Sequence, residues 1–377
     1  MTYPFDIQAE TGLEPVVDAF QANFEDGLEH GASVFALRDG DVILDLKGGW
    51  ADKEGTEAVG QDHLFSVFSS GKAAAALVIA HLADQDRLGY DQNVSSIWPA
   101  FAAEGKDLLT IGQIMSHQHG LSGITNPEWQ STDWYDWDKT CAELASQKPI
   151  FEPGSASGYS PITFGFLAGE IARLTDRFGR SIGEILRQDI CEPHGLDVWL
   201  GLPTSEHHRS VYMQKPRRMA KFGEITPATR AAFLEKWSVT GGMDVKEWRS
   251  AQLAGSNCQA TAEGMARLMN AFVDGTIEGS VFLAEDMLEK VRQSRISGQD
   301  QVLPFELNLA AGLMLNYPNF FYGPNPVTVG HSGWGGSCVF ADPDAGITFC
   351  YAMTRQDNSL MGDPRPVRII EALYDAL

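Results

Sequence analysis

The chain is short of positive charge. Lys and Arg together number 28 against 50 Asp and Glu, and the formal net charge is -22. Binding to phosphate groups needs a basic surface, so this balance argues against nucleic acid and against anionic membranes as partners. No apolar run is long enough to cross a bilayer, and the first residues lack a basic segment followed by an apolar one. We therefore expect no membrane association and no secretory leader.

Cysteine is scarce, and its spacing fits no known framework. None of the five cysteines falls in a Cys-x-x-Cys pair; they are Cys141, Cys191, Cys258, Cys338 and Cys350. An odd number of scattered cysteines fits free thiols in a reducing compartment better than a disulfide framework. We therefore expect a cytoplasmic protein in which most cysteines are small core residues.

Metal and cofactor motifs are missing as well. The only close histidine sets are His117-Gln118-His119 and His207-His208, and neither has a carboxylate or cysteine at ligand spacing. No glycine-rich phosphate loop or dinucleotide fingerprint is visible. The expectation is a protein without metal or cofactor, in which these histidines serve their loops.

What is present is a globular composition, with 44% hydrophobic and 10% aromatic residues over 377 residues. Such a chain can bury a large core as one domain or two lobes. Hydrophobic periodicity and turn signals predict strands near both ends of the chain and helices between them. The expected strands are 32–37, 42–46, 309–315, 328–333, 338–341 and 347–353. The expected helices are 14–24, one following Lys72, 111–117, 134–147, 162–174, 183–189, 226–237, 261–273, 284–293 and 366–377.

This order predicts an α+β fold with one antiparallel sheet built from both chain ends. Terminal helices would flank the sheet, and a large helical lobe would be inserted in the middle. We expect residues 1–61 and 295–377 to form one discontinuous lobe and residues 62–294 to form the mainly helical lobe. The active site is expected between the two lobes, and the oligomeric state is left open.

The stretch from Phe65 to Leu88 turns abruptly into an Ala-rich run, which predicts a buried helix starting near Ser69 or Ser70. In a helix, residues three apart share a face, so Lys72 would stand beside the Ser69 hydroxyl. Burial lowers the pKa of a lysine, and a neutral lysine can take a proton from serine. Alternatively, the serine only caps the helix and the lysine only decorates it.

Two later stretches could complete a catalytic site. Tyr159 lies in a loop before the expected helix at Ile162, where its phenol, ionising more easily next to a lysine ammonium, could shuttle the serine proton. The alternative is a tyrosine that packs the loop against the core. The run 329–337 holds four glycines, which would let the backbone approach a ligand. The alternatives are a tight bend at a sheet corner and, for His331, a structural histidine.

Taken together, Ser69-x-x-Lys72, Tyr159-Ser160 and Gly330-His331-Ser332-Gly333 resemble the three motifs of the serine β-lactamase and penicillin-binding-protein superfamily. The resemblance covers roughly residues 31–373 and is strongest to the class C-like branch. Segments 108–121 and 260–266 resemble the corresponding segments of that branch. It includes family VIII carboxylesterases, D-aminopeptidases, DD-peptidases and 6-aminohexanoate-oligomer hydrolases.

The resemblance implies roles for individual residues. Ser69 resembles the acylated nucleophile, Lys72 its general base, and Tyr159 the group that passes the proton to the leaving group. The backbone N–H groups of Ser69 and Trp334 would form the oxyanion hole. The remaining implied substrate contacts are His331, Ser332, Gly333 and Gly335.

Two departures from the pattern bear on the substrate. Pro161 stands where the lactamases have the Asn of Tyr-x-Asn, and His331 stands where β-lactamases and many penicillin-binding proteins have lysine. Trp334-Gly335-Gly336 is similar to the family VIII esterases instead. The expected reaction is therefore hydrolysis of a small-molecule ester. The alternatives are an amide-directed relative (weak β-lactamase, D-aminopeptidase, DD-peptidase or amide-oligomer hydrolase), an acyltransferase, or a silent binding protein.

Gly179-Arg180-Ser181-Ile182-Gly183 matches the Gly-x-Ser-x-Gly elbow of α/β-hydrolases. A charged amphipathic helix is expected before it rather than a buried strand, so we expect Ser181 and Glu184 to form a capping box. Residues 209–224 are expected to form a surface loop near the site. An aromatic cleft is expected from Trp98, Trp129, Trp134, Trp137, Trp237, Phe320 and Tyr322.

Overall fold

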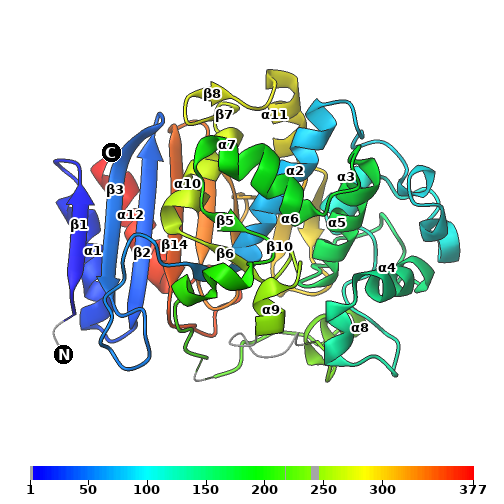
Figure 1. The fold of residues 1–377 in the computed structure, drawn as a ribbon, viewed down its shortest axis with the longest axis horizontal. Coiled ribbons are helices and arrows are strands. Elements are labelled where there is room, and N and C mark those ends of the chain that lie inside the picture. The colour runs from blue at the N-terminus through cyan, green and yellow to red at the C-terminus, as the bar shows by residue number, and fades with distance from the viewer. Residues whose placement is uncertain (1–2, 217, 239–245) are drawn as a thin grey trace.

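The fold is centred on a nine-stranded antiparallel sheet (Figure 1). The structure is a computed structural model that describes residues 3–216, 218–238 and 246–377. The strand order is β1-β3-β2-β14-β13-β12-β11-β10-β9. The first three strands come from the start of the chain: β1 (Phe5–Ala9), β2 (Gly31–Arg38) and β3 (Asp41–Gly49). The others come from its end: β9 (Ile296–Gln299), β10 (Glu306–Leu309), β11 (Met314–Leu315), β12 (Val329–Ser332), β13 (Cys338–Asp342) and β14 (Ile347–Met353).

The two ends of the chain meet where β2 pairs with β14. Their register places Val34 opposite Tyr351 and Ala36 opposite Phe349. Every residue of β14 is buried, because helices cover both faces of the sheet. Helices α1 (Glu14–Glu25) and α12 (Pro364–Ala376) pack together, and α1 contacts β1 and β3. Helix α10 (Ala262–Met269) packs against β2, β13 and β14. The expected fold class is confirmed.

The long middle segment supplies a helical region around α2 (Lys72–Asp84). Helix α2 packs against α5 (Thr163–Thr175) and α11 (Glu285–Arg292). The other helices of this segment are α3 (Ile111–Met115), α4 (Trp137–Ser146), α6 (Ile182–Ile185), α7 (Glu192–His194), α8 (Pro227–Thr229) and α9 (Lys246–Ser250). It also contains the small sheet β4-β6-β5 (Phe65–Phe68, Cys258–Ala260, Val198–Trp199) and the pair β7 (Thr276–Ile277) and β8 (Ser280–Val281).

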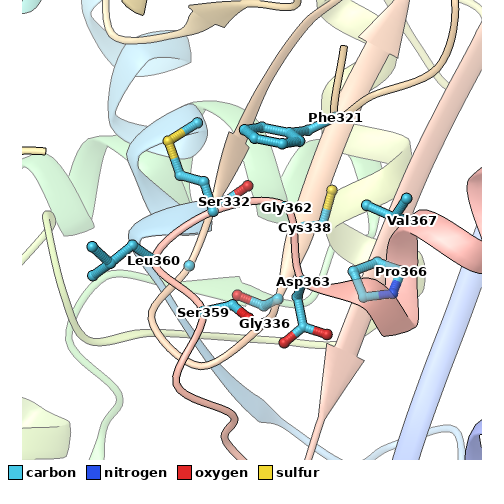
Figure 2. A pocket seen from close by; sticks show the side chains of 13 residues that line it. Phe321, Ser332, Gly336, Cys338, Ser359, Leu360, Gly362, Asp363, Pro366 and Val367 are labelled. Carbon is cyan, nitrogen blue, oxygen red and sulfur yellow. The ribbon is translucent and has the colours of Figure 1, made fainter. Parts of the chain in front are cut away.

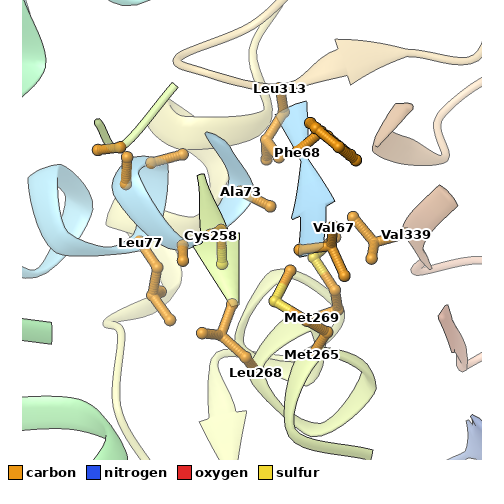
Figure 3. Close-up of a cluster of buried hydrophobic side chains, with 14 of the residues drawn as sticks. Val67, Phe68, Ala73, Leu77, Cys258, Met265, Leu268, Met269, Leu313 and Val339 are labelled. Carbon is orange, nitrogen blue, oxygen red and sulfur yellow. The ribbon is translucent and has the colours of Figure 1, made fainter. Parts of the chain in front are cut away.

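The core joins the small sheet to the large one (Figure 3). Side chains of β4, β6, α2, α10 and β13 meet there, among them Val67, Cys258, Leu77, Met265 and Val339. All five cysteines are buried free thiols. In the described part of the chain, no helix is long and apolar enough to cross a membrane.

The secondary structure differs from the expected one in detail. The strand expected at 309–315 is interrupted by a turn, in which Gly312 has φ +86 and a Cβ would lie 2.8 Å from the Cβ of Ala76 in α2. The helix expected at 226–237 is present but shorter, since α8 continues directly into a π-helix at Arg230–Leu234. Residues 65–68 form β4, an element that the following Ala-rich run concealed.

Candidate active site

A sharp turn between β4 and α2 presents Ser69. Phe68, the last residue of β4, has φ +49, a left-handed conformation that is costly for a side chain of this size. Ser69 begins the single turn Ser69–Gly71 that leads into α2. Gly71 is required there, because a Cβ at this position would lie 2.1 Å from the Cβ of Cys258. The expected helix start near Ser69 is therefore confirmed, with an abrupt strand-to-helix turn as its cause.

Lys72 lies beside Ser69, as the helical spacing predicts. Its Nζ is 3.0 Å from Ser69 Oγ, 3.1 Å from the carbonyl oxygen of Pro161 and 2.6 Å from that of Gly255. The side chain is fully buried, and burial lowers the pKa of the amine well below its usual value. Because each carbonyl can only accept, a neutral amine donates both N–H groups to them. Its lone pair then remains for the Ser69 hydroxyl, which also lies 3.2 Å from Gly255 O.

Tyr159 completes the group at the nucleophile. Its ring centroid lies 4.9 Å from Lys72 Nζ, and its hydroxyl is hydrogen-bonded to Ser69. Burial raises the pKa of the phenol above its usual value, although the bond to Ser69 opposes this. The expected easier ionisation of Tyr159 is therefore wrong. Burial favours the protonated phenol.

Asp300 fixes the Tyr159 loop, and sequence reasoning missed it. Its carboxylate accepts the Tyr159 N–H at 3.1 Å and the Ser157 hydroxyl at 2.8 Å. It also accepts the N–H groups of Val302 and Leu303 at 2.8 and 2.9 Å. The side chain is buried, and burial raises the pKa of this carboxyl. The sequence shows Asp300 only as an acidic residue between Gln299 and Gln301, which does not point to Tyr159.

Ser160 is buried between two histidines. Its hydroxyl lies 2.7 Å from His117 Nδ1 and 3.2 Å from His119 Nε2. Leu121 donates its N–H to His119 Nδ1, and burial lowers the pKa of both imidazoles. Neutral rings therefore support the Tyr159 loop from behind. Among the described residues, no group of three His, Cys, Asp or Glu side chains is arranged to hold a metal.

His331 is a buried, uncharged residue. Burial, together with the nearby Lys72, lowers the pKa of its imidazole to about 3. Its Nδ1 lies 2.8 Å from the carbonyl oxygen of Ser332, which can only accept, so this nitrogen carries a proton. The site therefore has no fixed charge at this position.

Trp334 lies in the glycine loop, the segment Gly333–Ser337 that follows β12. Ser70 Oγ is 3.0 Å from Ser337 Oγ and donates to the carbonyl oxygen of His331 at 3.3 Å. Ser337 Oγ in turn donates to Val67 O at 2.7 Å. These bonds fasten the glycine loop to the turn that carries Ser69. The Ser69 N–H opens its helical turn and has no partner within it.

A cavity of about 390 Å³ opens over these residues and is called the nucleophile cavity below. Ser69, Tyr159, Ser332 and Trp334 line it, together with mainly apolar side chains from both 62–294 and 295–377. Besides Tyr159, five aromatic residues of the described chain contribute to its walls: Phe68, Phe222, Phe233, Trp248 and Trp334. The rings of Phe222, Phe233 and Trp334 are stacked on one another.

The aromatic cleft expected from the sequence is wrong, because none of its seven members is among the described residues lining the nucleophile cavity. Trp129 and Trp134, for example, are buried in contact with each other. The expected surface loop does reach the site, since Lys215, Met219 and Phe222 line the cavity. Of the expected substrate contacts, Ser332 lines it as well. Contacts from His331, Gly333 and Gly335 stay predictions.

The alternative nucleophile Ser181 has the predicted capping role. Its N–H donates to Glu184 Oε2 at 2.8 Å, and the Glu184 N–H donates to Ser181 Oγ at 3.3 Å. These reciprocal bonds form a capping box at the start of α6. The Gly-x-Ser-x-Gly match is therefore a helix cap rather than a strand-to-helix elbow.

Comparison with known proteins agrees with this geometry. A family model described as Beta-lactamase matches residues 20–374. The chain is 30% identical over 355 residues to "Esterase/beta-lactamase LipL" of Mycobacterium tuberculosis, covering 90% of this chain and 80% of that protein.

Two solved structures are similar over nearly the whole chain. One is a penicillin-binding protein homologue from Caulobacter crescentus, with 47% identity, a TM-score of 0.96 and coverage of 99% of this chain and 100% of that one. The other is a family VIII carboxylesterase, with 37% identity, a TM-score of 0.93 and the same coverage.

Proposed function

Since the chain belongs to the beta-lactamase family, we propose that it is a serine hydrolase that cleaves small carboxylic esters through an acyl-enzyme on Ser69. The observation that carries this proposal is the contact between Ser69 Oγ and Lys72 Nζ at 3.0 Å, with the amine fully buried. A buried, uncharged amine at this distance is a base for the serine hydroxyl.

In the first step, Lys72 Nζ takes the Ser69 proton while Ser69 Oγ attacks the ester carbonyl carbon. The resulting ammonium has three N–H groups, which match the three acceptors around it: Pro161 O, Gly255 O and Ser69 Oγ. The same cage therefore accommodates both protonation states without rearrangement. The N–H groups of Ser69 and Trp334 are proposed to hold the negative carbonyl oxygen.

In the second step, the C–O bond to the leaving alkoxide breaks. Tyr159 gives its phenolic proton to the alkoxide and recovers one from Lys72, which becomes neutral again. The raised pKa of Tyr159 suits this role, because the phenol is fully protonated beforehand. Water then attacks the acyl carbon, and the proton transfers of the acylation run in reverse. This returns the carboxylic acid and free Ser69.

Three features support an ester over a β-lactam or peptide. Pro161 has no side-chain amide to hold a substrate amide. His331 is neutral and offers no partner to a substrate carboxylate. An alkoxide or phenolate leaves more readily than an amine, so hydrolysis of an ester requires less protonation of the leaving group. The apolar walls of the nucleophile cavity support an uncharged acyl or alcohol group of moderate size. Residues from both 62–294 and 295–377 line this cavity, which supports an active site between the two lobes.

One observation favours a second candidate. The relative from Mycobacterium tuberculosis carries both esterase and beta-lactamase in its name. We therefore keep weak β-lactam hydrolysis by the same Ser69 as a secondary activity. It would use the same nucleophile, base and oxyanion donors.

The test is hydrolysis of p-nitrophenyl acetate and butyrate by the wild type, Ser69→Ala and Ser181→Ala, with a chromogenic cephalosporin alongside. Ester turnover that is lost only in Ser69→Ala supports the proposal. Turnover that survives in Ser69→Ala contradicts it. A wild type that hydrolyses the cephalosporin faster than either ester would make the second candidate the main activity.

A further inference from the structure

A buried arginine holds the glycine loop from the side away from the substrate. Arg365 lies in the first turn of α12, and its side chain is 2% exposed. Arg365 is not one of the described residues that line the nucleophile cavity. It is nevertheless in direct contact with the residue that follows Trp334 in the chain.

The guanidinium uses all five of its N–H donors. Nε and Nη2 donate to the two oxygens of Asp363 at 2.9 Å each. Nη1 donates to Glu29 Oε2 at 3.2 Å and to Arg355 O at 2.8 Å. The fifth donor, on Nη2, goes to the carbonyl oxygen of Gly335 at 2.7 Å. A lysine has three donors and no planar fork, so it cannot reproduce this set.

The partners of Arg365 are themselves fixed. The Glu29 side chain is fully buried and accepts a hydrogen bond from the Tyr351 hydroxyl. Asp363 is the N-cap of α12 and accepts the Arg365 N–H at 3.0 Å. The groups that hold the guanidinium therefore belong to α12, to the segment after α1 and, through Tyr351, to β14. Its position is determined independently of the glycine loop.

The glycine loop is closed at its ends, where the Gly333 N–H donates to Ser337 O at 2.7 Å and the Gly336 N–H donates to Gly333 O at 3.1 Å, so Arg365 acts on the middle of the loop. Gly335 and Gly336 have φ values of +86 and +125, a region that glycine adopts without the steric cost that a Cβ would bring. A Cβ on Gly336 would lie 2.4 Å from Arg365 Nη2 and 2.6 Å from Asp363 Oδ2. Figure 2 shows Asp363 beside Gly336, with Ser332 and Cys338 on the flanking strands. Beyond Arg365, the Asp357 N–H donates to Gly335 O at 2.9 Å and Gln356 Nε2 to Trp334 O at 3.3 Å.

From this arrangement we infer that Arg365 is a positioning residue for the oxyanion hole. By fixing Gly335 O, it sets the orientation of the preceding peptide groups and so aims the Trp334 N–H at the substrate oxygen. The inference rests on the proposed function, in which that N–H stabilises the tetrahedral intermediate. An oxyanion donor contributes only when its direction is preorganised. Loss of Arg365 should therefore weaken transition-state binding more than substrate binding.

The experiment compares Arg365→Lys and Asp363→Asn with the wild type. Asp363→Asn keeps the helix cap but replaces one oxygen that holds the guanidinium with an amide NH₂. Arg368→Met is the matched control, because Arg368 lies on the same helix, is 41% exposed and contacts Asp26 and Asn23, neither of which accepts a hydrogen bond from the Arg365 guanidinium. The measurements are kcat and KM for p-nitrophenyl acetate, the Ki of phenylboronic acid, and the thermal unfolding midpoint.

Removing one oxyanion donor typically lowers kcat by about 10²- to 10³-fold, and a misaimed donor should cost somewhat less. For Arg365→Lys we expect a fall in kcat of about 10- to 100-fold, a parallel rise in the boronate Ki and a KM within about threefold of the wild type. For Asp363→Asn we expect a smaller change in the same direction. Arg368→Met should match the wild type in all three kinetic quantities.

Wild-type kcat and boronate Ki in a folded Arg365→Lys overturn the inference. If Arg365→Lys does not fold, Asp363→Asn decides: unchanged kinetics overturn the inference, and a selective loss of kcat and boronate affinity supports it. A change in KM alone also overturns it. Ser69→Ala in the same assay separates the two proposals, because activity that survives in Ser69→Ala contradicts the proposed function instead.

Discussion

The Nζ atom of Lys72 lies 3.1 Å from the main-chain carbonyl oxygen of Pro161. The departure from the Tyr-x-Asn pattern is therefore compensated at the lysine: a backbone oxygen serves where an asparagine side chain would. Gly255 O is the second such oxygen, at 2.6 Å. Orientation of the base in this protein depends on main-chain geometry.

This relationship predicts that Pro161→Ala retains activity. Alanine keeps the carbonyl group, and the neighbouring Ser160 stays held between two histidines. We expect kcat for p-nitrophenyl acetate within about threefold of the wild type, since no reacting group is removed. A loss of about 10²-fold or more, with an unchanged unfolding midpoint, would show that the proline ring itself shapes the site.

Lys72→Met should abolish turnover and raise stability. The base is lost, so we expect kcat to fall by about 10³-fold or more. In the wild type, burial lowers the pKa of the folded amine well below its usual 10.5, so the folded state holds this proton less tightly than the unfolded chain does. The unfolded chain binds that proton below pH 10.5, which favours unfolding increasingly as the pH falls toward the folded pKa.

The stability gain in Lys72→Met should therefore be large near neutral pH and shrink as the pH rises toward 10.5. Denaturant unfolding of both proteins at several pH values between 7 and 10 measures the difference. Methionine has a similar length and no ionisable group, which makes it a suitable replacement. Because methionine also removes the hydrogen bonds to Pro161 O and Gly255 O, the pH dependence decides: a stability difference that does not vary with pH would mean that Lys72 is charged in the folded protein.

Tyr159→Phe should discriminate between leaving groups. The hydroxyl is proposed to protonate the departing oxygen, and the aromatic ring that packs against Lys72 is kept. An alkyl ester, whose alkoxide is strongly basic, should lose about 10²- to 10⁴-fold in kcat/KM. A p-nitrophenyl ester should lose less, because its phenolate leaves without protonation. Equal losses for matched alkyl and p-nitrophenyl acetates would instead assign Tyr159 to activation of Ser69.

The sequence predicted those parts of the site that depend on local geometry. Ser69 and Lys72 share a face because of their spacing, and Ser181 caps a helix because Glu184 follows three residues later. Both relationships lie within one helical turn and need no knowledge of the rest of the chain. The strand pattern at both chain ends likewise predicted one antiparallel sheet, although its two edge strands β1 and β9 were not expected.

Contacts made by distant segments could not be predicted in this way. Asp300 reaches Tyr159 across more than a hundred residues, and the acceptors at Lys72 are backbone oxygens that any residue type would supply. The aromatic cleft was misplaced for a related reason. Composition does not distinguish a ring buried in the helical region, such as Trp134, from one that lines a cavity, such as Trp248.

The central claim is that Ser69 carries the acyl group. The most direct measurement is mass spectrometry of the protein quenched during turnover of p-nitrophenyl butyrate, followed by peptide mapping, with Ser69→Ala and Ser181→Ala in parallel. We expect a butyryl adduct on the peptide containing Ser69 in the wild type and in Ser181→Ala, and none in Ser69→Ala. An adduct on any other residue, or one that persists in Ser69→Ala, would contradict it.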